Sequence, residues 1–215
     1  PLPGVGRSRG CCSARDAADA RRVAGQLGIP FYSLDFEEHF GRIIEDFVDE
    51  YARARTPNPC VRCNQWLKFG HLGELAEDLG AQRIATGHYA RIHQGQLARG
   101  RDRQKDQSYY LFSLSRAQRD QALFPLGEWT KEDVRRKARD LQLPTADKPE
   151  SQDVCFVPGG NYRHVLQARR PDASKPGSII DTEGKVIGEH PGVSHFTIGQ
   201  RRGLGVGLGY PAYVV

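Results

Sequence analysis

Helical and strand-like patterns alternate along the N-terminal half of the chain, and this alternation limits the possible folds more than any other feature. Apolar residues at helical spacing predict helices over residues 13–27, 40–55 and 65–79. Short runs rich in β-branched and aromatic residues predict buried strands over residues 29–36 and 83–86. Such alternation is typical of a parallel sheet with helices on its faces, because each parallel crossover needs a connecting segment.

The loop between the second and third predicted helices carries the strongest chemical signal, Thr56-Pro57-Asn58-Pro59-Cys60-Val61-Arg62-Cys63-Asn64. Proline lacks an N–H and restricts the residue before it, so the two prolines predict a stiff loop. This loop should present two thiols and two carboxamides at a helix start. The helix N-terminus and the nearby basic side chains favour the thiolate, which is the reactive form of cysteine.

Spacing alone leaves several interpretations of Cys60-x-x-Cys63 open beside ordinary packing: half of a zinc site, a thioredoxin-like redox pair, or sulfur transfer. No second paired motif follows, and a long helix rather than a strand precedes the loop. Sulfur transfer would use the distant Cys155, whose sulfur would have to come within bonding distance of Cys63.

Two other polar segments are candidates for ligand binding. Gly87 and His88 follow the second predicted strand, and ligands of parallel sheets bind at the carboxyl ends of strands. His88 could equally be a turn histidine whose hydrogen bonds are satisfied within the fold. The segment Lys105-Asp106-Gln107 suits contacts with a phosphate or a base edge, although a solvated polar turn is the commoner role of such a sequence.

The middle of the chain continues the mixed pattern. We predict a hairpin around Gly95, a capped helix that begins after Thr130, a strand over residues 154–157 and a short helix over residues 162–168.

The character of the sequence changes after Pro171. A hairpin is predicted over residues 178–187 and a strand over 195–198, followed by a glycine-rich segment in which Arg201 and Arg202 suit approach to phosphates. We therefore place a partial catalytic α/β domain over residues 1–170 and a partial, β-containing central domain over residues 171–215.

Composition narrows the function classes. The formal net charge of +5 fits either ordinary solubility or a polyanionic partner such as nucleic acid. Five cysteines, an odd number in a chain of this length, argue against a secreted disulfide framework and favour a reducing cytoplasm. No apolar run reaches the ~20 residues that span a bilayer, and no membrane association is expected.

Several motifs together resemble one family, the bacterial tRNA-specific 2-thiouridylases of the MnmA type. They occur in the family's order and at compatible spacing, and with the opening segment from Cys11 to Phe36 they cover nearly all of the chain beyond Gly10: TPNPCVRCN, ATGHYARI, KDQSYYLFSLS, SQDVCFV and HFTIGQRRGLGVG.

The resemblance implies an α/β fold: a parallel-sheet PP-loop ATP pyrophosphatase-like (adenine nucleotide alpha hydrolase-like) domain, here truncated, followed by a small β-containing central domain. It implies that ATP and Mg²⁺ activate the 2-carbonyl of the tRNA wobble uridine by adenylation, after which sulfur replaces the oxygen. The sulfur would come from a persulfide donor or relay protein of a cysteine desulfurase system.

The resemblance also implies roles for individual residues. Cys155 would carry the persulfide, and Cys63 would free the sulfur and end in a disulfide with Cys155. Gly87 would contact ATP. No residue is assigned to a metal site. The tRNA would be bound by two groups of residues, the first around the target base: Asn58, Pro59 and Cys60, and then His88, Lys105, Asp106 and Gln107.

Two features depart from the family pattern: the N-terminal Ser-Gly-Gly-x-Asp-Ser phosphate loop is not present in residues 1–10, and we expect the family's C-terminal β-barrel to be missing from this fragment as well. In addition, Cys60 stands where some members carry Asp. We therefore expect this chain to be inactive by itself. Two alternatives remain: an iron–sulfur cluster bound by Cys60, Cys63 and Cys155 that holds the transferable sulfur, and a non-catalytic RNA-binding remnant.

Overall fold

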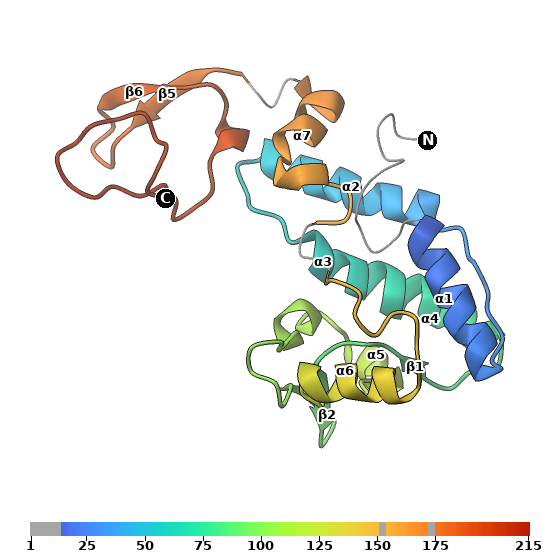
Figure 1. Ribbon diagram of the computed structural model, residues 1–215. Coiled ribbons are helices and arrows are strands. Elements are labelled where there is room, and N and C mark those ends of the chain that lie inside the picture. Colours follow the sequence, from blue (N-terminus) through green and yellow to red (C-terminus); the bar gives the residue numbers. More distant parts are fainter. Residues whose placement is uncertain (1–13, 151–153, 172–174) are drawn as a thin grey trace. The chain divides into compact units, whose positions relative to one another are not determined.

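The computed structural model describes residues 14–150, 154–171 and 175–215 (Figure 1). The chain folds into two units that alternate along the sequence, with three boundaries, two of which fall inside helices. The first unit contains the described residues up to Phe40 together with Cys60–Gln152, and the second contains Gly41–Pro59 together with Asp153–Val215. Some residues named in the sequence analysis lie outside the described ranges. They are Cys11, Cys12, the predicted helix start at Ser13, and Ser151-Gln152-Asp153 of the SQDVCFV motif.

The first unit contains most of the helices. Helix α1, Ala14–Leu27, is followed by Gly28, whose φ of 66° ends the helix as predicted. The bounds are α1 Ala14–Leu27, α2 Glu37–Ala52, which continues into the second unit, α3 Pro59–Arg62, η2 Cys63–His71, α4 Leu72–Asp78, η3 Ser108–Leu111, α5 Arg116–Gln121 and α6 Lys131–Asp140.

A short parallel strand pair gives this unit its α/β character. Strand β1, Ile84–Ala85, pairs in parallel with β4, Ala122–Leu123. The N–H of Thr86 extends the ladder by donating to the carbonyl of Leu123 at 3.0 Å. The predicted strand at 83–86 and the predicted parallel arrangement are therefore confirmed, and the carboxyl end of β1 runs directly into Gly87 and His88.

The core of the first unit lies under this strand pair. Its fully buried members are Phe69, Ala90, Leu111, Leu114 and Ala122. The predicted hairpin around Gly95 is confirmed as β2, Ala90–His93, and β3, Gln96–Arg99, and it contributes Ala90 to that core. Helix α6 begins after Thr130 as predicted, with a complete capping box between Thr130 and Asp133.

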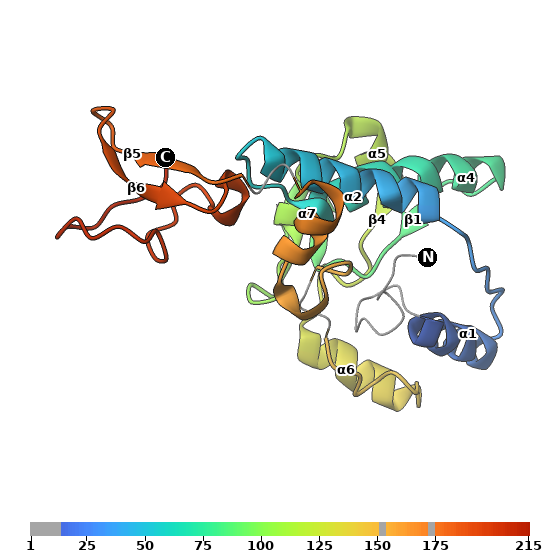
Figure 2. The same cartoon turned by 90° about the horizontal axis from the view of Figure 1, so that it is seen from above.

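Aromatic packing joins the helical elements of the second unit. Helix α7, Arg163–Arg169, forms close to its predicted position and lies beside α2 in both views (Figures 1 and 2). The ring of Tyr162 stacks on Tyr51 at a centroid distance of 4.4 Å, and Phe47 meets the edge of Phe156 at 5.1 Å. Arg170 also forms an ion pair with Asp49 at 2.7 Å.

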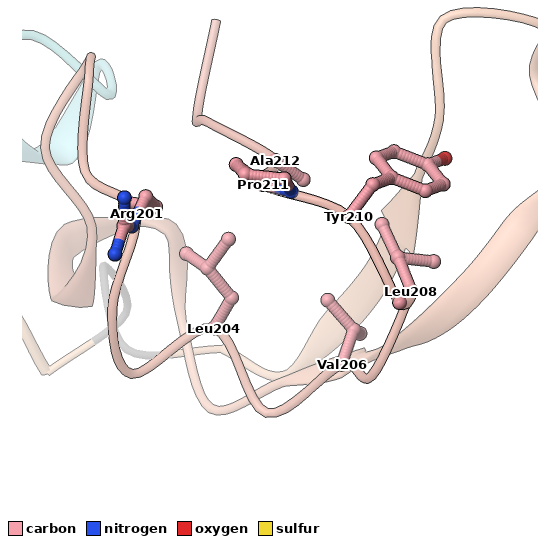
Figure 3. Close-up of a pocket in the computed structure, with 8 residues that line it drawn as sticks. Arg201, Leu204, Val206, Leu208, Tyr210, Pro211 and Ala212 are labelled. Carbon is pink, nitrogen blue, oxygen red and sulfur yellow. The ribbon is translucent and has the colours of Figure 1, made fainter.

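A hairpin and a long loop complete the second unit. Strands β5, Gly177–Ile180, and β6, Val186–His190, confirm the predicted hairpin. Short 3-10 helices occur at η4, Pro158–Gly160, and η6, Val193–His195. The final loop turns back over the hairpin around an apolar cavity of about 620 Å³. Figure 3 shows Leu204, Val206 and Leu208 pointing from this loop toward the Tyr210–Ala212 segment.

Three predicted strands do not form. Residues 29–36 pair with no strand within the described residues, and three of their large side chains, Ile29, Tyr32 and Leu34, are exposed. Residues 154–157 form a turn in which the Val157 N–H donates to the Val154 carbonyl. Strand propensity describes how a residue fits a sheet and does not supply the neighbouring strand, which explains both errors.

The third error, at residues 195–198, has a local cause. The side chain of Gln200 accepts a hydrogen bond from the Thr197 N–H, while the Gln200 N–H donates to the Thr197 carbonyl. These two bonds close a turn over the segment that was predicted as a strand, and Ile198 is left exposed.

Candidate functional site around the Cys60–Cys63 helix start

The cysteine loop runs into a helix that begins at Pro59. Proline is favoured at the first helical position, because its missing N–H would have had no intrahelical partner there. Cys60 is exposed and Cys63 is half-buried, so two thiols are presented in the first turn and just after it, as the sequence predicts. Asn58 and Pro59 precede them and belong, with the end of the loop, to the second unit.

The helix that follows Cys63 differs from the predicted one. We expected an α-helix over residues 65–79, whereas residues Cys63–His71 form a π-helix, η2, which continues as α4. The N–H of Leu72 donates to the carbonyl of Leu67, five residues earlier. π-helices are rare, and they occur frequently at functional sites.

Asn64 ties the start of this π-helix to the segment that contains the predicted tRNA contacts. Its side chain is 2% exposed, and Nδ2 donates to the carbonyl of Tyr110 at 3.0 Å. Its Oδ1 atom is buried and has no hydrogen-bond partner among the described residues. Burying a carboxamide of which only one end is hydrogen-bonded has a free-energy cost.

Gly87 and His88 lie at the carboxyl end of β1, where the sequence places them. A Cβ on Gly87 would meet only Cδ1 of Leu126, at 3.8 Å, so packing does not require glycine there. His88 is 8% exposed, and its Nδ1 is 2.8 Å from Oγ1 of Thr86. Burial, with a smaller effect of the Lys68 charge, lowers the pKa of His88 to about 4. The imidazole is therefore neutral at pH 7.

The segment Lys105-Asp106-Gln107 is held by contacts within the first unit. Oε1 of Gln107 accepts from the N–H of Tyr89 at 3.1 Å, and Asp106 accepts from the N–H of Gly100 at 2.9 Å. Burial tends to raise the pKa of Asp106, but its hydrogen bonds from Gly100 and Ser108 outweigh that effect and leave the pKa lowered. These two side chains fix the loop that carries Lys105.

Glu150 connects that loop to helix α6. Its carboxylate pairs with Nζ of Lys105 at 2.7 Å and with Nζ of Lys131 at 3.0 Å. The hydrogen bonds from Lys105 and then Lys131 lower the pKa of Glu150 to about 2. Two lysines are thus gathered around one carboxylate beside the predicted tRNA-binding segment.

Cys155 belongs to the second unit and is half-buried. The two residues after it anchor the turn, because Phe156 is 7% exposed and Val157 is 3% exposed. Each of the two units therefore carries one of the two predicted catalytic thiols.

The sequence indicated Asn64 only as one of the two carboxamides near the cysteines, and we predicted no role for Gln118 or Glu150 from it. The Ser115-x-x-Gln118 spacing matches a capping box, which the structure contains, and this pattern could have identified Gln118. No local pattern indicates Glu150, because its partners Lys105 and Lys131 lie far from it in the sequence.

We searched residues 14–150, 154–171 and 175–215 for a metal site and for a membrane-spanning helix. Within them, no group of three or more His, Cys, Asp or Glu side chains is arranged to hold a metal ion. No helix of the same ranges is both long and apolar enough to cross a bilayer.

A parallel strand pair among helices, followed by a small β-containing region, places the chain in the α/β class. The family model described as tRNA methyl transferase HUP domain matches residues 4–159, and that described as tRNA methyl transferase PRC-barrel domain matches residues 163–215.

Curated relatives identify the family more specifically than these domain descriptions do. The chain is 50% identical over 213 residues to the tRNA-specific 2-thiouridylase MnmA of Rhodopirellula baltica, with 96% of this chain and 53% of the relative covered. It is 52% identical over 213 residues to that of Carboxydothermus hydrogenoformans, covering 96% of this chain and 58% of the relative. The chain spans between half and two thirds of the length of these relatives. It belongs to the tRNA-specific 2-thiouridylase (MnmA) family.

Proposed function

We propose that this chain takes part in the synthesis of 2-thiouridine in tRNA, by ATP-dependent transfer of sulfur to the wobble uridine. The observation that supports this most directly is the presentation of Cys60 and Cys63 at a helix start in a chain that is 50% identical to a tRNA-specific 2-thiouridylase. A helix N-terminus stabilises a thiolate, and the thiolate is the form that attacks a persulfide.

Cys155 and Cys63 carry the sulfur in this proposal. A donor of the cysteine desulfurase type leaves Cys155 as a persulfide, and the Cys63 thiolate attacks the Cys155 sulfur that is bonded to carbon. A Cys63–Cys155 disulfide forms and the outer sulfur leaves as hydrosulfide, so the outer sulfur is reduced and the two thiols are oxidised. Hydrosulfide then attacks C2 of the adenylated uridine and AMP leaves. A thiol reductant resets the disulfide.

ATP supplies the leaving group, with Mg²⁺ as its counterion. Gly87 is the residue of this chain that we assign to ATP. Its position after β1 is the usual ligand edge of a parallel sheet, and the absence of a side chain leaves its backbone open to a ligand.

Seven residues would hold the tRNA. We assign the target base to Asn58, Pro59 and Cys60, and the surrounding nucleotides to His88, Lys105, Asp106 and Gln107. In the latter group Lys105 provides the charge for a phosphate, while Asp106 and Gln107 fix the loop through Gly100 and Tyr89. We also propose that the reaction takes place in the cytoplasm, where thiols stay reduced between turnovers.

The test is a thiolation assay with a chimera in which this chain replaces the matching segment of the Rhodopirellula baltica relative. With tRNA, ATP and a persulfide donor, mass spectrometry should detect 2-thiouridine. Cys63→Ser and Cys155→Ser should each abolish the product, whereas Cys60→Ser, which removes a thiol in the same helix turn, should retain part of it. The chain alone should give no product.

The alternatives give different results in the same experiment. A bound iron–sulfur cluster would make the anaerobically purified protein brown, give about stoichiometric iron and make Cys60→Ser as damaging as Cys63→Ser. A non-catalytic RNA-binding protein would bind tRNA equally well with and without Cys63 and never form 2-thiouridine. Product formation that survives Cys63→Ser would overturn the proposal.

A further inference from the structure

Gln118, on helix α5, makes its contacts to the π-helix that begins at Cys63. We propose that Gln118 is a positioning residue: by holding residues Cys63–His71 in π-helical form, it sets the direction in which the Cys63 thiol is presented. This inference rests on the proposed function for its meaning, because it supplies the geometry of the attacking thiol. Its test requires neither tRNA nor ATP.

Both the nitrogen and the oxygen of the Gln118 carboxamide form hydrogen bonds. Nε2 donates to the carbonyl of Gln65 at 2.9 Å and to the carbonyl of Phe69 at 3.0 Å, both within η2. Oε1 accepts from the N–H of Ser115 at 3.0 Å and so completes the capping box of α5. One carboxamide therefore fastens the N-terminus of α5 to two successive turns of the π-helix.

The wide turn is also built into the sequence at Gly70. A Cβ at this position would lie 2.9 Å from the carbonyl oxygen of Gln65, closer than real Cβ atoms approach backbone. Glycine is thus required at the point where the π-turn crowds the same carbonyl that Gln118 binds. The hydrogen bond from Gln118 and the close approach that only glycine allows at Gly70 both involve the carbonyl of Gln65, so we infer that the π-form is fixed at this point.

The direction of Cys63 depends on this form. An α-helix closes i→i−4 bonds with 3.6 residues per turn, whereas the π-form closes i→i−5 bonds and turns less per residue. If residues 63–71 relaxed to an α-helix, Cys63 would rotate about the helix axis relative to α4. Asn64 holds the other side of the same turn through its bond to the Tyr110 carbonyl, so such a rotation would also break that contact.

Gln118→Glu separates the two uses of the side chain. A carboxylate still accepts from the Ser115 N–H, so the capping box and α5 remain, but it cannot donate to the Gln65 and Phe69 carbonyls. Gln26→Glu is the matched control, because Gln26 also donates through Nε2 to two backbone carbonyls of the first unit, those of Leu141 and Gln142.

The measurement is the alkylation rate of each cysteine by iodoacetamide as a function of pH, with peptides resolved by mass spectrometry. In Gln118→Glu we expect the Cys63 rate at pH 7 to change by about tenfold, with a displaced midpoint of its pH profile, since the thiolate fraction follows the thiol's surroundings. The exposed Cys60 serves as the internal reference. Amide exchange over residues 68–72 should become about tenfold faster.

Unchanged Cys63 kinetics in a folded Gln118→Glu protein would overturn the proposal. So would a change of the same size in Gln26→Glu, because that result would indicate general loosening. Should Gln118→Glu fail to fold, Gln118→Met removes the same two hydrogen-bond donations without introducing a charge. The pH profile of Cys63 alkylation in that variant then tests the proposal. Thiolation could be demonstrated while this inference fails, so the two outcomes are distinguishable.

Discussion

The contacts that hold the candidate binding loops of the first unit differ in kind from those that join the helices of the second unit. In the first unit, side chains bind backbone groups: Gln107 binds Tyr89, Asp106 binds Gly100, and Gln118 binds the π-helix. In the second unit, the helical part is held by rings, with Tyr51 stacked on Tyr162 and Phe47 against Phe156. Hydrogen bonds are directional and fix loops at defined angles, whereas apolar contacts mainly supply stability.

This difference agrees with the placement of the proposed chemistry. The first unit carries most of the residues that we assign to the nucleotide and the tRNA, all except Asn58 and Pro59, and its loops are fixed by bonds of definite direction. The second unit carries Cys155 on a turn that two buried apolar residues, Phe156 and Val157, anchor by packing. Three measurements test whether the two units differ in this way.

The largest effect is expected from truncating one buried leucine in the core of each unit. Leu111 is 0% exposed in the first unit and Leu166 is 1% exposed in the second. Replacing either by alanine should cost about 2–5 kcal/mol in the free energy of unfolding. Both tryptophans, Trp66 and Trp129, belong to the first unit. Urea denaturation followed by tryptophan fluorescence should therefore shift for Leu111→Ala and hardly shift for Leu166→Ala.

Circular dichroism, which reports on both units, is the second probe in that experiment. It should detect the Leu166→Ala destabilisation that tryptophan fluorescence misses. Coincident shifts of both probes in both variants would mean that the two units unfold as one, and the comparison would then describe two parts of a single cooperative structure.

The next effect is a pH dependence confined to the first unit. Burial lowers the pKa of His88 to about 4, whereas an unfolded histidine titrates near 6.5. Between these values the unfolded state binds more protons, so the stability rises with pH. It is fully present above pH ~6.5 and falls by about 3 kcal/mol on acidification to pH ~4. The fluorescence-detected denaturation midpoint, measured from pH 7.5 to 4, checks this.

His88→Asn should flatten that profile. In the second unit, burial, with smaller effects of Arg163 and His190, also lowers the pKa of His195, but this side chain is only partly buried. His195→Asn should therefore leave the fluorescence profile unchanged. A profile of the same slope in the His88→Asn protein would show that another group causes the acid sensitivity.

The smallest effect on stability is expected from removing the side-chain cap of α6, since α7 in the second unit has no such cap. Thr130 caps α6 by accepting from the Asp133 N–H, whereas Tyr162 at the start of α7 makes no side-chain cap hydrogen bond. Thr130→Ala should lower stability by about 1 kcal/mol, and Thr130→Ser should restore most of it. Fluorescence-detected urea midpoints measure both, and equal midpoints for alanine and serine would exclude a role for the cap.

Local signals in the sequence predicted several elements correctly for identifiable reasons. The apolar stripe that includes Ile43, Phe47 and Val48 predicted α2, and the glycine turn at Gly184 predicted the β5–β6 hairpin. The cysteines at a helix start followed from Pro59. The boundary at residue 171 and the roles of the site residues remain predictions.

The errors arose where the outcome depends on distant partners. Residues 29–36 have strand composition, but no strand of the described residues pairs with them, and residues 195–198 contain the turn that Gln200 closes. The π-helix was missed because a residue's own helix propensity does not distinguish π from α. It depends on Gln118, which lies far along the chain from Gln65.

The family to which the chain belongs, and the candidate residues for its chemistry, could be read from the sequence, because side-chain identity, proline constraints and motif order are properties of the covalent chain. Tertiary structure alone decided the neutral, buried state of His88, the pairing of Glu150 with two lysines and the π-form after Cys63. Each of these depends on groups that are distant in sequence, and only folding brings them within the short range of hydrogen bonds and desolvation.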